Sequence, residues 1–201
     1  MDHLDALVRS TPLLDHPTLI AVDGVDGSGK TTFAAELADR YARQGRAAHV
    51  VHMDDFLNPR TVRYRLGRDS PEGFFQDTYD LATFTASIIE PLRRPGGPSI
   101  VSRAFDYRAD RPVLEDPTHV SPDAVVIVEG MFLHRDELLG TWDMSIFLEV
   151  SFAISVRRLA ERDGTSPNPD DPSVRRYVEG QRIYLAACTP NQRATHVITN
   201  H

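Results

Sequence analysis

The sequence predicts an α/β protein built on a doubly wound parallel sheet. Segments with strand character alternate with segments of helical periodicity along the 201 residues. Residues 124–128 and 144–150 are continuous apolar runs, which are typical of parallel strands covered by helices on both faces. A glycine-rich motif over residues 24–31 lies between a predicted strand and a predicted helix. Together these observations indicate one domain with its ligands at the carboxyl ends of the strands.

The motif over residues 24–31 has the pattern G-x-x-x-x-G-K-[ST] of a phosphate-binding P-loop. Lys30 is the only lysine in the sequence, and arginine substitutes poorly for its compact charge at the β and γ oxygens. Residues 17–23 resemble a buried strand and residues 31–43 an amphipathic helix, which is the context that the motif requires. We therefore predict that the nucleotide is bound by Gly24, Asp26, Gly27, Ser28, Gly29, Lys30, Thr31 and Thr32.

The other predicted elements follow in the order expected of a doubly wound sheet. A Pro- and Asp-rich loop at residues 163–172 is expected to be a mobile lid between two helices. Residues 99–105 and 111–120 are extended segments that could pair outside the main sheet. The predicted helices cover residues 4–8, 79–92 and 151–162, and the further strands cover residues 47–53, 124–128, 144–150 and 195–199.

Composition narrows the class of protein. The net charge is −7 and the pI is near 5.6, which disfavours a nucleic-acid or anionic-membrane partner. Cys188 is the single cysteine, so an internal disulfide is excluded. The first residues lack the basic and apolar regions of a secretory signal, and no apolar run reaches membrane-spanning length. We expect a cytoplasmic protein with a small-molecule partner, and the sequence leaves a homo-oligomer open.

Carboxylates follow two predicted strands at the edge where the P-loop should lie. Glu129 ends the apolar strand 124–128 and could hold Mg²⁺ with Thr31, or it could be a solvated strand end. Asp54 and Asp55 end the second strand. Either could accept the proton of a substrate hydroxyl, although both could simply begin a turn.

Two groups of arginines flank these positions. The first is interpreted either as a solvated face or as a charged flap over an anionic group. The second surrounds the predicted lid, where some members could neutralise transition-state charge. The first group consists of Arg60, Arg63, Arg65 and Arg68, and the second of Arg157, Arg158, Arg162, Arg175 and Arg176.

The motifs together resemble the uridine kinase/phosphoribulokinase branch of the P-loop kinases, from Leu19 to Asn200. Asp54-Asp55-Phe56 is similar to the D-S-F or D-G-F segment of that branch, which implies that Asp54 is the catalytic base and Asp55 a neighbour on the metal side. Val128-Glu129-Gly130 matches F-E-G, and Arg162-Asp163 matches the R-D that opens the lid.

Two further segments concern the acceptor. Residues 69–74 resemble D-H-P-D-A-F, in which the first aspartate, here Asp69, holds ribose hydroxyls. Residues 105–107 resemble Y-D-F, which lines the nucleoside pocket with Phe105 and Tyr107. The histidine that reads the pyrimidine is missing after Tyr107, and the lid lacks the basic residues of the family. ATP-dependent phosphorylation of a hydroxyl is therefore better supported than uridine as the acceptor.

The resemblance implies a P-loop kinase fold with a five-stranded parallel sheet flanked by helices, a small β-hairpin at the acceptor site and a lid. The implied cofactors are ATP and Mg²⁺. The predicted catalytic residues are Asp54, Lys30 and Arg162, and the predicted metal ligands are Thr31, Glu129 and Asp54. The residues predicted to bind the acceptor or its phosphate are Asp54, Asp69, Phe105, Tyr107, Arg158 and Arg176.

The leading hypothesis is a kinase for a nucleoside or a related small metabolite. The alternatives are a kinase for an anionic acceptor such as a sugar phosphate, suggested by the first arginine group, and a non-catalytic nucleotide-binding module. A thymidylate kinase lacks support because its later Asp-Arg segment has no convincing counterpart. A guanine-specific GTPase is excluded, since its N-K-x-D motif requires a second lysine beyond Lys30.

Overall fold

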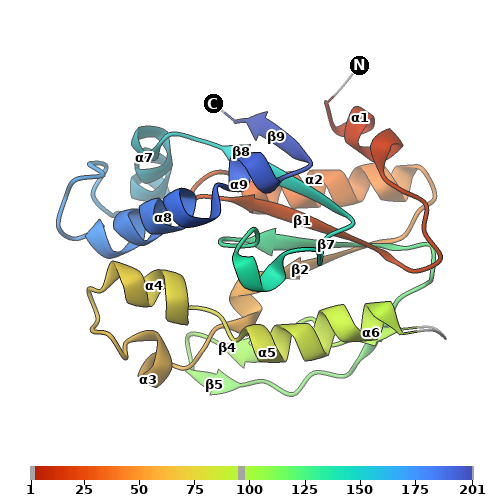
Figure 1. Cartoon of the computed structure of the whole chain (residues 1–201), viewed down its shortest axis with the longest axis horizontal. Coiled ribbons are helices and arrows are strands. Elements are labelled where there is room, and N and C mark those ends of the chain that lie inside the picture. Colours follow the sequence, from red (N-terminus) through yellow and green to blue (C-terminus); the bar gives the residue numbers. More distant parts are fainter. Residues whose placement is uncertain (1–2, 95–97, 201) are drawn as a thin grey trace.

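The computed structural model describes residues 3–94 and 98–200, which form a five-stranded parallel sheet in the order β2-β7-β1-β8-β9 (Figure 1). Register aligns Val22 of β1 with Glu129 of β7, and His52 of β2 with the same Glu129. The strands are β1 (Thr18–Gly24), β2 (Ala48–His52), β7 (Val125–Gly130), β8 (Met144–Glu149) and β9 (His196–Thr199). The predicted α/β fold with a five-stranded parallel sheet is confirmed.

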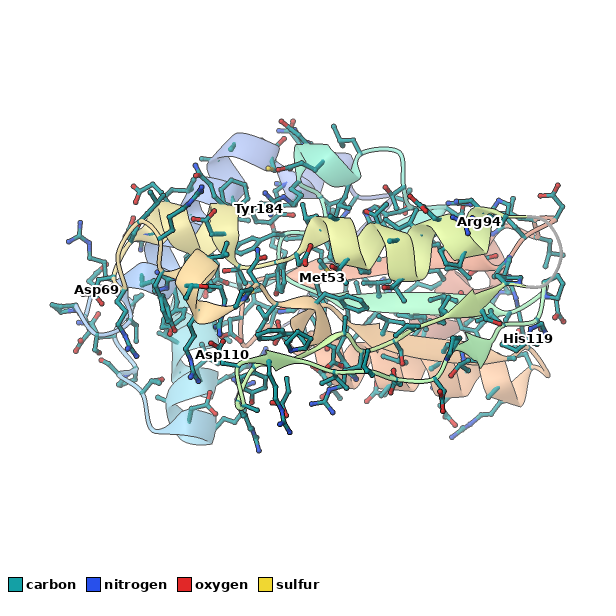
Figure 2. The ribbon with its side chains drawn as sticks, turned by 90° about the horizontal axis from the view of Figure 1, so that it is seen from below. Met53, Asp69, Arg94, Asp110, His119 and Tyr184 are labelled. Carbon is teal, nitrogen blue, oxygen red and sulfur yellow. The ribbon has the colours of Figure 1, made fainter. Side chains whose placement is uncertain are left out.

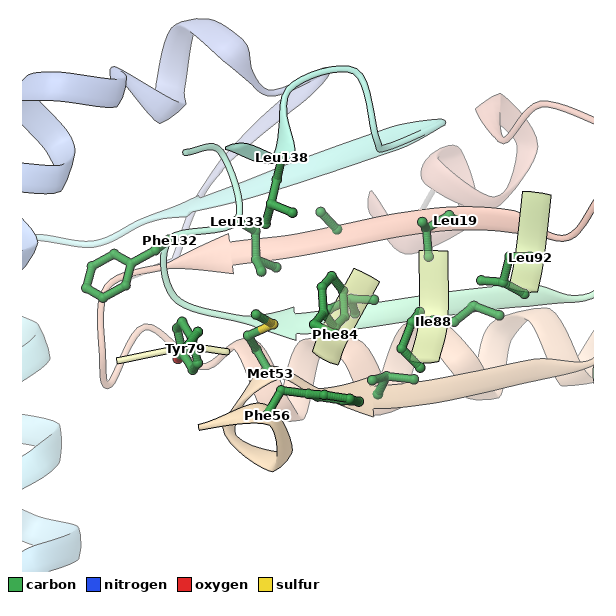
Figure 3. Packing of buried hydrophobic residues seen from close by; sticks show 14 of the residues in the cluster. Leu19, Met53, Phe56, Tyr79, Phe84, Ile88, Leu92, Phe132, Leu133 and Leu138 are labelled. Atoms are coloured by element: carbon green, nitrogen blue, oxygen red, sulfur yellow. The ribbon is translucent and has the colours of Figure 1, made fainter. Parts of the chain in front are cut away.

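Helices cover both faces of this sheet because β1 has apolar side chains on each of its two faces. Ile20 and Val22 pack in one cluster with α1 (His3–Ser10) and α2 (Lys30–Arg43). Leu19 and Ala21 belong to the other cluster, whose residues meet the helix that follows Asp80 (Figure 3). A strand with no polar face must be covered on both sides, as the sequence predicts.

The helix predicted over residues 79–92 begins two residues later than expected. Its three parts are α5 (Leu81–Phe84), a wider π-type turn (Thr85–Ile89) and α6 (Glu90–Arg93). Asp80 caps the first turn by accepting from the N–H of Thr83 at 3.0 Å. Pro91 has no N–H to donate, and the carbonyl of Ser87 accepts from the N–H of Val101 instead.

Phe84, Ile88 and Leu92 form the buried stripe of this helix, and all three are fully buried against the sheet (Figure 3). Their spacing of four residues places them on one face. Complete burial of such a side chain contributes about 1.5–3 kcal/mol relative to exposure. The helix is therefore held by its packing, which explains why it tolerates an irregular turn.

The remaining helices include both short and long elements. Ser70 accepts from the N–H of Gly73 at 3.0 Å and caps α4 (Pro71–Asp77), a helix that the sequence interpretation missed although Ser-Pro-Glu is a typical helix start. The others are η1 (Met53–Phe56), α3 (Arg60–Arg63), η3 (Asp136–Leu138), α7 (Phe152–Asp163), α8 (Arg175–Cys188) and α9 (Pro190–Arg193).

The extended segments outside the main sheet form two short antiparallel pairs, as predicted. Ser99–Ile100 (β3) pairs with Thr118–His119 (β6), and Phe105–Asp106 (β4) pairs with Arg111–Pro112 (β5). The second pair is a small hairpin, which matches the one that the family resemblance implies at the acceptor side. Within the described residues, no helix combines the length and the apolar character needed to cross a membrane.

Candidate active site

The P-loop joins the end of β1 to the start of α2, and its glycines are required by its geometry. Gly27 and Gly29 have φ angles of +71° and +91°, which side chains rarely adopt. A Cβ atom on Gly27 would lie 2.7 Å from the backbone oxygen of Ser155. No side chain caps the start of α2, so the first N–H groups of this helix remain available to a phosphate.

Lys30 is held inside the loop. Its side chain is buried, and Nζ donates to the carbonyl of Val25 at 2.9 Å. This contact folds the ammonium group over the loop, where it faces the space that a phosphate would fill. Lys30 therefore has the position that the motif predicts.

Thr31 and Glu129 are brought together, as predicted, because α2 starts beside the end of β7. Thr31 Oγ1 donates to Glu129 Oε1 at 3.2 Å. The same carboxylate oxygen lies 2.6 Å from Nδ1 of His52, and this hydrogen bond raises the pKa of His52. The sequence interpretation missed His52, although the last residues of neighbouring parallel strands meet at the same edge.

Asp54 lies in η1, directly after β2, and faces the P-loop. Tyr79 donates its hydroxyl to Asp54 Oδ1 at 2.9 Å. The surrounding protein raises the pKa of Asp54 by desolvation, while the Tyr79 hydrogen bond and the charge of Lys30 act in the opposite direction. A carboxylate in this setting is suited to take a proton from a hydroxyl.

Asp55 points elsewhere. Its carboxylate lies 3.3 Å from Nε of Arg103, and its carbonyl accepts from the N–H of Ala104. Of the two adjacent aspartates, only Asp54 therefore lines the cavity beside the P-loop.

Arg162 lies across this cavity from α2, close to the end of α7. Its guanidinium group binds Asp163 at 2.7 Å and lies 3.9 Å from Oδ1 of Asp26. Arg158, one turn earlier, contacts the carbonyl of Gly27 at 3.4 Å and lines the phosphate side of the loop. Arg158 was predicted to bind the acceptor or its phosphate. It lies beside the P-loop and does not line the acceptor side.

Two cavities of about 160 Å³ each share Asp26, Asp54 and Met131, so a phosphate side and an acceptor side meet at Asp54. The phosphate side is lined by Asp26, Lys30, Thr31, Asp54, Glu129, Gly130, Met131 and Arg162. The acceptor side is lined by Asp26, Asp54, Leu57, Arg63, Tyr64, Phe74, Thr78, Tyr107, Met131, Arg176 and Tyr177.

The residues predicted for the acceptor are distributed differently from expectation. Tyr107 and Arg176 line the acceptor side, whereas Asp69 and Phe105 are not among its lining residues. Phe105 is buried in the β4–β5 hairpin. Asp69 lines an adjoining cavity, which shares Tyr64, Arg176 and Tyr177 with the acceptor side, and Figure 2 shows Asp69 at one end of the molecule, away from Met53, the neighbour of Asp54. The long loop before α4 carries Asp69 outward, which sequence spacing alone could not indicate.

Arg176 lines the cavity and also binds backbone carbonyls of a neighbouring segment. Its guanidinium group donates to the carbonyls of Arg63, Arg68 and Ser70 at 2.9–3.0 Å, and it is buried over Tyr64. It therefore fixes the segment between α3 and α4 to α8.

The first arginine group is also engaged by protein. Arg63 donates to the carbonyl of Asn58 at 2.7 Å and lies 3.4 Å from Asp110, while Arg65 pairs with Asp77 at 2.8 Å. Arg60 contacts the carbonyls of residues 107 and 108, and Arg68 lies over the ring of Tyr64. Figure 2 places Asp110 beside this segment. These contacts order the segment, which weakens the interpretation as an open anionic flap.

The backbone of Asp26 is bound by two helices, α7 and α8, which flank the predicted lid. Gln181 of α8 accepts from the N–H of Asp26 at 2.6 Å, and Ser155 of α7 donates to its carbonyl at 2.6 Å. Both side chains are buried. No sequence pattern predicts these contacts, because they join residues that are more than a hundred positions apart.

A second buried network supports the start of the P-loop. Asp23 accepts from the N–H of Gly24 at 2.7 Å and from the hydroxyl of Tyr184, and it lies 2.7 Å from Nδ1 of His134. Asp23 and His134 are almost completely buried. This network joins β1, the loop after β7 and α8 beneath the phosphate site (Figure 2 shows Tyr184).

The donor set around Thr31 fits a magnesium ion that is shared with a phosphate. Mg²⁺ in such sites takes one or two protein oxygens and completes its shell with phosphate and water. Thr31 Oγ1 and Glu129 Oε1 are adjacent, and Asp54 lines the same cavity. Among the residues that the structure describes, no group of three or more His, Cys, Asp and Glu side chains is arranged to hold a metal without a ligand.

Comparison with known proteins agrees with this geometry. The sequence profile of the "Phosphoribulokinase / Uridine kinase family" matches residues 19–200. The chain belongs to this family. The match includes both the P-loop and the strand β7 that carries Glu129, so the candidate active site lies within the shared part.

Individual members of the family bear out the relationship. A uridine kinase of Leuconostoc citreum is 29% identical over 154 residues, which cover 73% of this chain and 69% of that protein. A solved structure provisionally named a fructose transport system kinase, from Silicibacter sp. TM1040, is 27% identical with a TM-score of 0.72 and covers 98% of this chain and 100% of its own. A possible uridine kinase from Bacillus stearothermophilus has a TM-score of 0.75 at 22% identity, covering 97% and 96%, and shows the shared fold.

Proposed function

We propose that the protein is an ATP-dependent kinase that transfers the γ-phosphoryl group to a hydroxyl of a small metabolite. The observation that carries this proposal is the meeting of the two cavities at Asp54. Phosphoryl transfer depends on positioning and on charge stabilisation, with a base beside the attacking hydroxyl. Membership of the family supports the same reaction class.

Four residues of the phosphate side, Lys30, Thr31, Glu129 and Arg162, have roles in the proposed reaction. Lys30 and the N–H groups at the start of α2 bind the β and γ phosphates. Thr31 and Glu129 would hold Mg²⁺, which neutralises charge on the phosphates when bound. Arg162 lies on the open side of the cavity, where its guanidinium group can stabilise charge on the transferred group.

Asp54 is the proposed base on the acceptor side. Desolvation raises its pKa, so the carboxylate takes up a proton more readily than an aspartate fully surrounded by water does. The proton leaves the acceptor hydroxyl as its oxygen bonds to the γ-phosphorus and the bond to the β-phosphate oxygen breaks. ADP and the phosphorylated acceptor are the products.

A nucleoside or a related polyhydroxylated metabolite is the first acceptor to test. Uridine kinases are among the relatives, and the side chains of Tyr107 and Tyr64 line the acceptor side. A phosphorylated acceptor is the second candidate, because Arg63 and Arg176 also line this cavity. Their contacts with Asp110 and with backbone carbonyls make it the weaker of the two.

A coupled assay of ADP release tests the proposal. We expect a metabolite from a panel of nucleosides, sugars and sugar phosphates to stimulate ADP release from ATP and Mg²⁺. Asp54→Asn should lower the rate constant of this reaction by about 10²–10⁴-fold, the range of general base catalysis, and should leave ATP binding unchanged.

Asp55→Asn is the matched control, because its carboxylate binds Arg103 instead of lining the cavity. It should retain most of the activity. Full activity of Asp54→Asn would contradict the assignment of the base. A folded protein that binds ATP but shows no acceptor-stimulated ADP release would favour a non-catalytic nucleotide-binding module.

A further inference from the structure

The P-loop carries a carboxylate where the motif does not require one. Asp26 occupies a variable position of the loop, and its side chain is about one-third exposed. A negative charge here opposes phosphate binding, because like charges repel. We therefore expect Asp26 to have a role on the acceptor side, whose cavity it also lines.

The geometry leaves one oxygen of this carboxylate available. Asp26 Oδ1 accepts from the N–H of Gly27 at 2.9 Å and lies 3.9 Å from Arg162. Within residues 3–94 and 98–200, no hydrogen bond reaches Oδ2. One oxygen thus orients the side chain, and the other can accept a hydrogen bond from a ligand.

The backbone of Asp26 is anchored by two helices, and the N–H of Gly27 orients its carboxylate through Oδ1. Gln181 and Ser155 bind its N–H and its carbonyl at 2.6 Å each, from α8 and α7. A group that is fixed by its own backbone contacts is pre-organised, so less conformational freedom is lost when a ligand binds. The structure therefore presents Asp26 in a constant direction.

Asp26 and Asp54 border the same acceptor cavity from opposite elements, the P-loop and η1. The negative charge of Asp26 also contributes to the raised pKa of Asp54. Asp69, which the family resemblance assigned to the hydroxyls of the acceptor, is not a lining residue of this cavity and lies in the adjoining one, beyond Tyr64 and Arg176. Asp26 is the second carboxylate of the acceptor side.

We propose that Asp26 binds a second hydroxyl of the acceptor while Asp54 takes the proton of the reacting hydroxyl. The acceptor is then a polyhydroxylated metabolite, such as a sugar or the sugar part of a nucleoside, and a simple alcohol is a poor substrate. A carboxylate that accepts a bond from a hydroxyl discriminates strongly against an analogue that lacks this hydroxyl. The inference rests on the proposed kinase function.

The test compares acceptors that differ by one hydroxyl. Wild-type enzyme is first assayed for acceptor-stimulated ADP release with uridine, D-fructose and their phosphates. The best of these is then compared with its single-deoxy analogues, which for uridine are the 2′-deoxy and 3′-deoxy compounds. We expect one analogue to have a KM at least tenfold above that of the parent, with the KM for ATP unchanged.

Asp26→Ala should abolish this difference. Its KM for the parent acceptor should rise to that of the deoxy analogue, and its KM for ATP should stay within about twofold. Asp26→Asn keeps the shape and the contact with Gly27, so we expect a smaller change in the same direction. Asp39→Ala is the control, because Asp39 is an exposed carboxylate of α2 that pairs with Arg43.

Distinct outcomes separate the two levels of the argument. No acceptor-stimulated ADP release by the wild type would overturn the proposed function. Stimulation by the parent and by every deoxy analogue with the same KM would overturn only the role of Asp26. A raised KM for ATP in Asp26→Ala, with acceptor discrimination intact, would place Asp26 with the nucleotide. If Asp26→Ala fails to fold, Asp26→Asn, which keeps the shape of the side chain, carries the same comparison: an unchanged KM for the parent acceptor and for its deoxy analogue in this variant would also overturn the role of Asp26.

Discussion

At the scale of single residues, the immediate surroundings of Asp54 govern the proposed chemistry. Tyr79 is the only side chain with a hydrogen bond to this carboxylate among the described residues, at 2.9 Å. Desolvation by the surrounding protein favours the protonated form of this carboxylate, and the hydroxyl of Tyr79 stabilises the ionised form. Since the base must be ionised to accept a proton, activity should fall as the pH falls through its pKa.

Tyr79→Phe removes the contribution that lowers the pKa of Asp54. The pKa should therefore rise, and the acidic limb of the kcat/KM profile should move to higher pH. The measurement is kcat/KM for the acceptor from about pH 5 to pH 9. Tyr41→Phe is the control, because the hydroxyl of Tyr41 bonds to Thr11 beneath the far end of α2. A shift in both variants, or in neither, would contradict the role of Tyr79.

The sequence was informative for some residues and silent for others for a physical reason. Lys30, Thr31 and Glu129 are fixed by contacts within the P-loop and between neighbouring strand ends, which sequence patterns describe well. The position of Asp69 could not be read from the sequence, because it lies in a loop that Arg176, more than a hundred residues away, holds by its backbone carbonyls. His52 was missed because its role depends on which strand lies beside β2.

At the scale of elements, α7 and α8 hold the P-loop as well as the lid between them. Ser155 and Gln181 bind the two polar groups of a single peptide residue, Asp26, from these two helices. The segment from residue 164 to residue 174, which contains most of the lid predicted over residues 163–172, therefore connects two helices that both contact the P-loop. A change in either helix should affect ATP binding.

Gln181→Leu tests this anchor. It removes the acceptor of the Asp26 N–H, and an unpaired buried donor costs about 1–3 kcal/mol. We expect a lower free energy of unfolding and a higher KM for ATP. Urea denaturation and steady-state kinetics measure the two effects, and addition of ATP should restore part of the stability by mass action.

Gln192→Leu is the matched control for this experiment. Gln192 is exposed on α9, so its removal should change neither stability nor the KM for ATP. If Gln181→Leu lowers stability but leaves the KM for ATP unchanged, the contact is structural only and the proposed link to the P-loop is wrong.

The helix from Leu81 to Arg93 shows how much of an element the sequence predicts. Apolar spacing over Leu81, Phe84, Ile88 and Ile89 predicted the helix, and Phe84 and Ile88 are fully buried, whereas Leu81 and Ile89 are only partly buried. It could not indicate the irregular turn, because that turn depends on Val101, which takes up the carbonyl that Pro91 leaves free. Periodicity reports which face is buried, whereas hydrogen bonds to other elements decide the details of the backbone.

At the scale of the whole molecule, a buried polar network fastens three parts of the fold beneath the active site. Asp23 at the end of β1 receives hydrogen bonds from the backbone of Gly24 and from Tyr184 of α8, and it contacts His134. Arg193 donates to the carbonyl of His134 at 2.8 Å. Removal of one member leaves a buried polar group without its partner.

Tyr184→Phe should lower the free energy of unfolding by about 1–3 kcal/mol, because Asp23 loses a buried hydrogen-bond donor while the ring remains in place. Urea-induced unfolding measures this change. Tyr107→Phe is the control, since the hydroxyl of Tyr107 is exposed and bonds only to Arg108. Equal stability of wild type and Tyr184→Phe would show that the network contributes little to folding.

Sequence patterns alone predicted the class of fold, and they placed a P-loop, Glu129 and Asp54 at one edge of the sheet, where the structure has them. These features depend on local patterns: apolar runs define strands buried on both faces, and the turn around Lys30 needs glycine at fixed positions. The order of the strands and the acceptor side were decided only by tertiary structure. Asp26 borders both cavities because α7 and α8 pack against the P-loop, and such contacts between distant segments leave no pattern in the sequence.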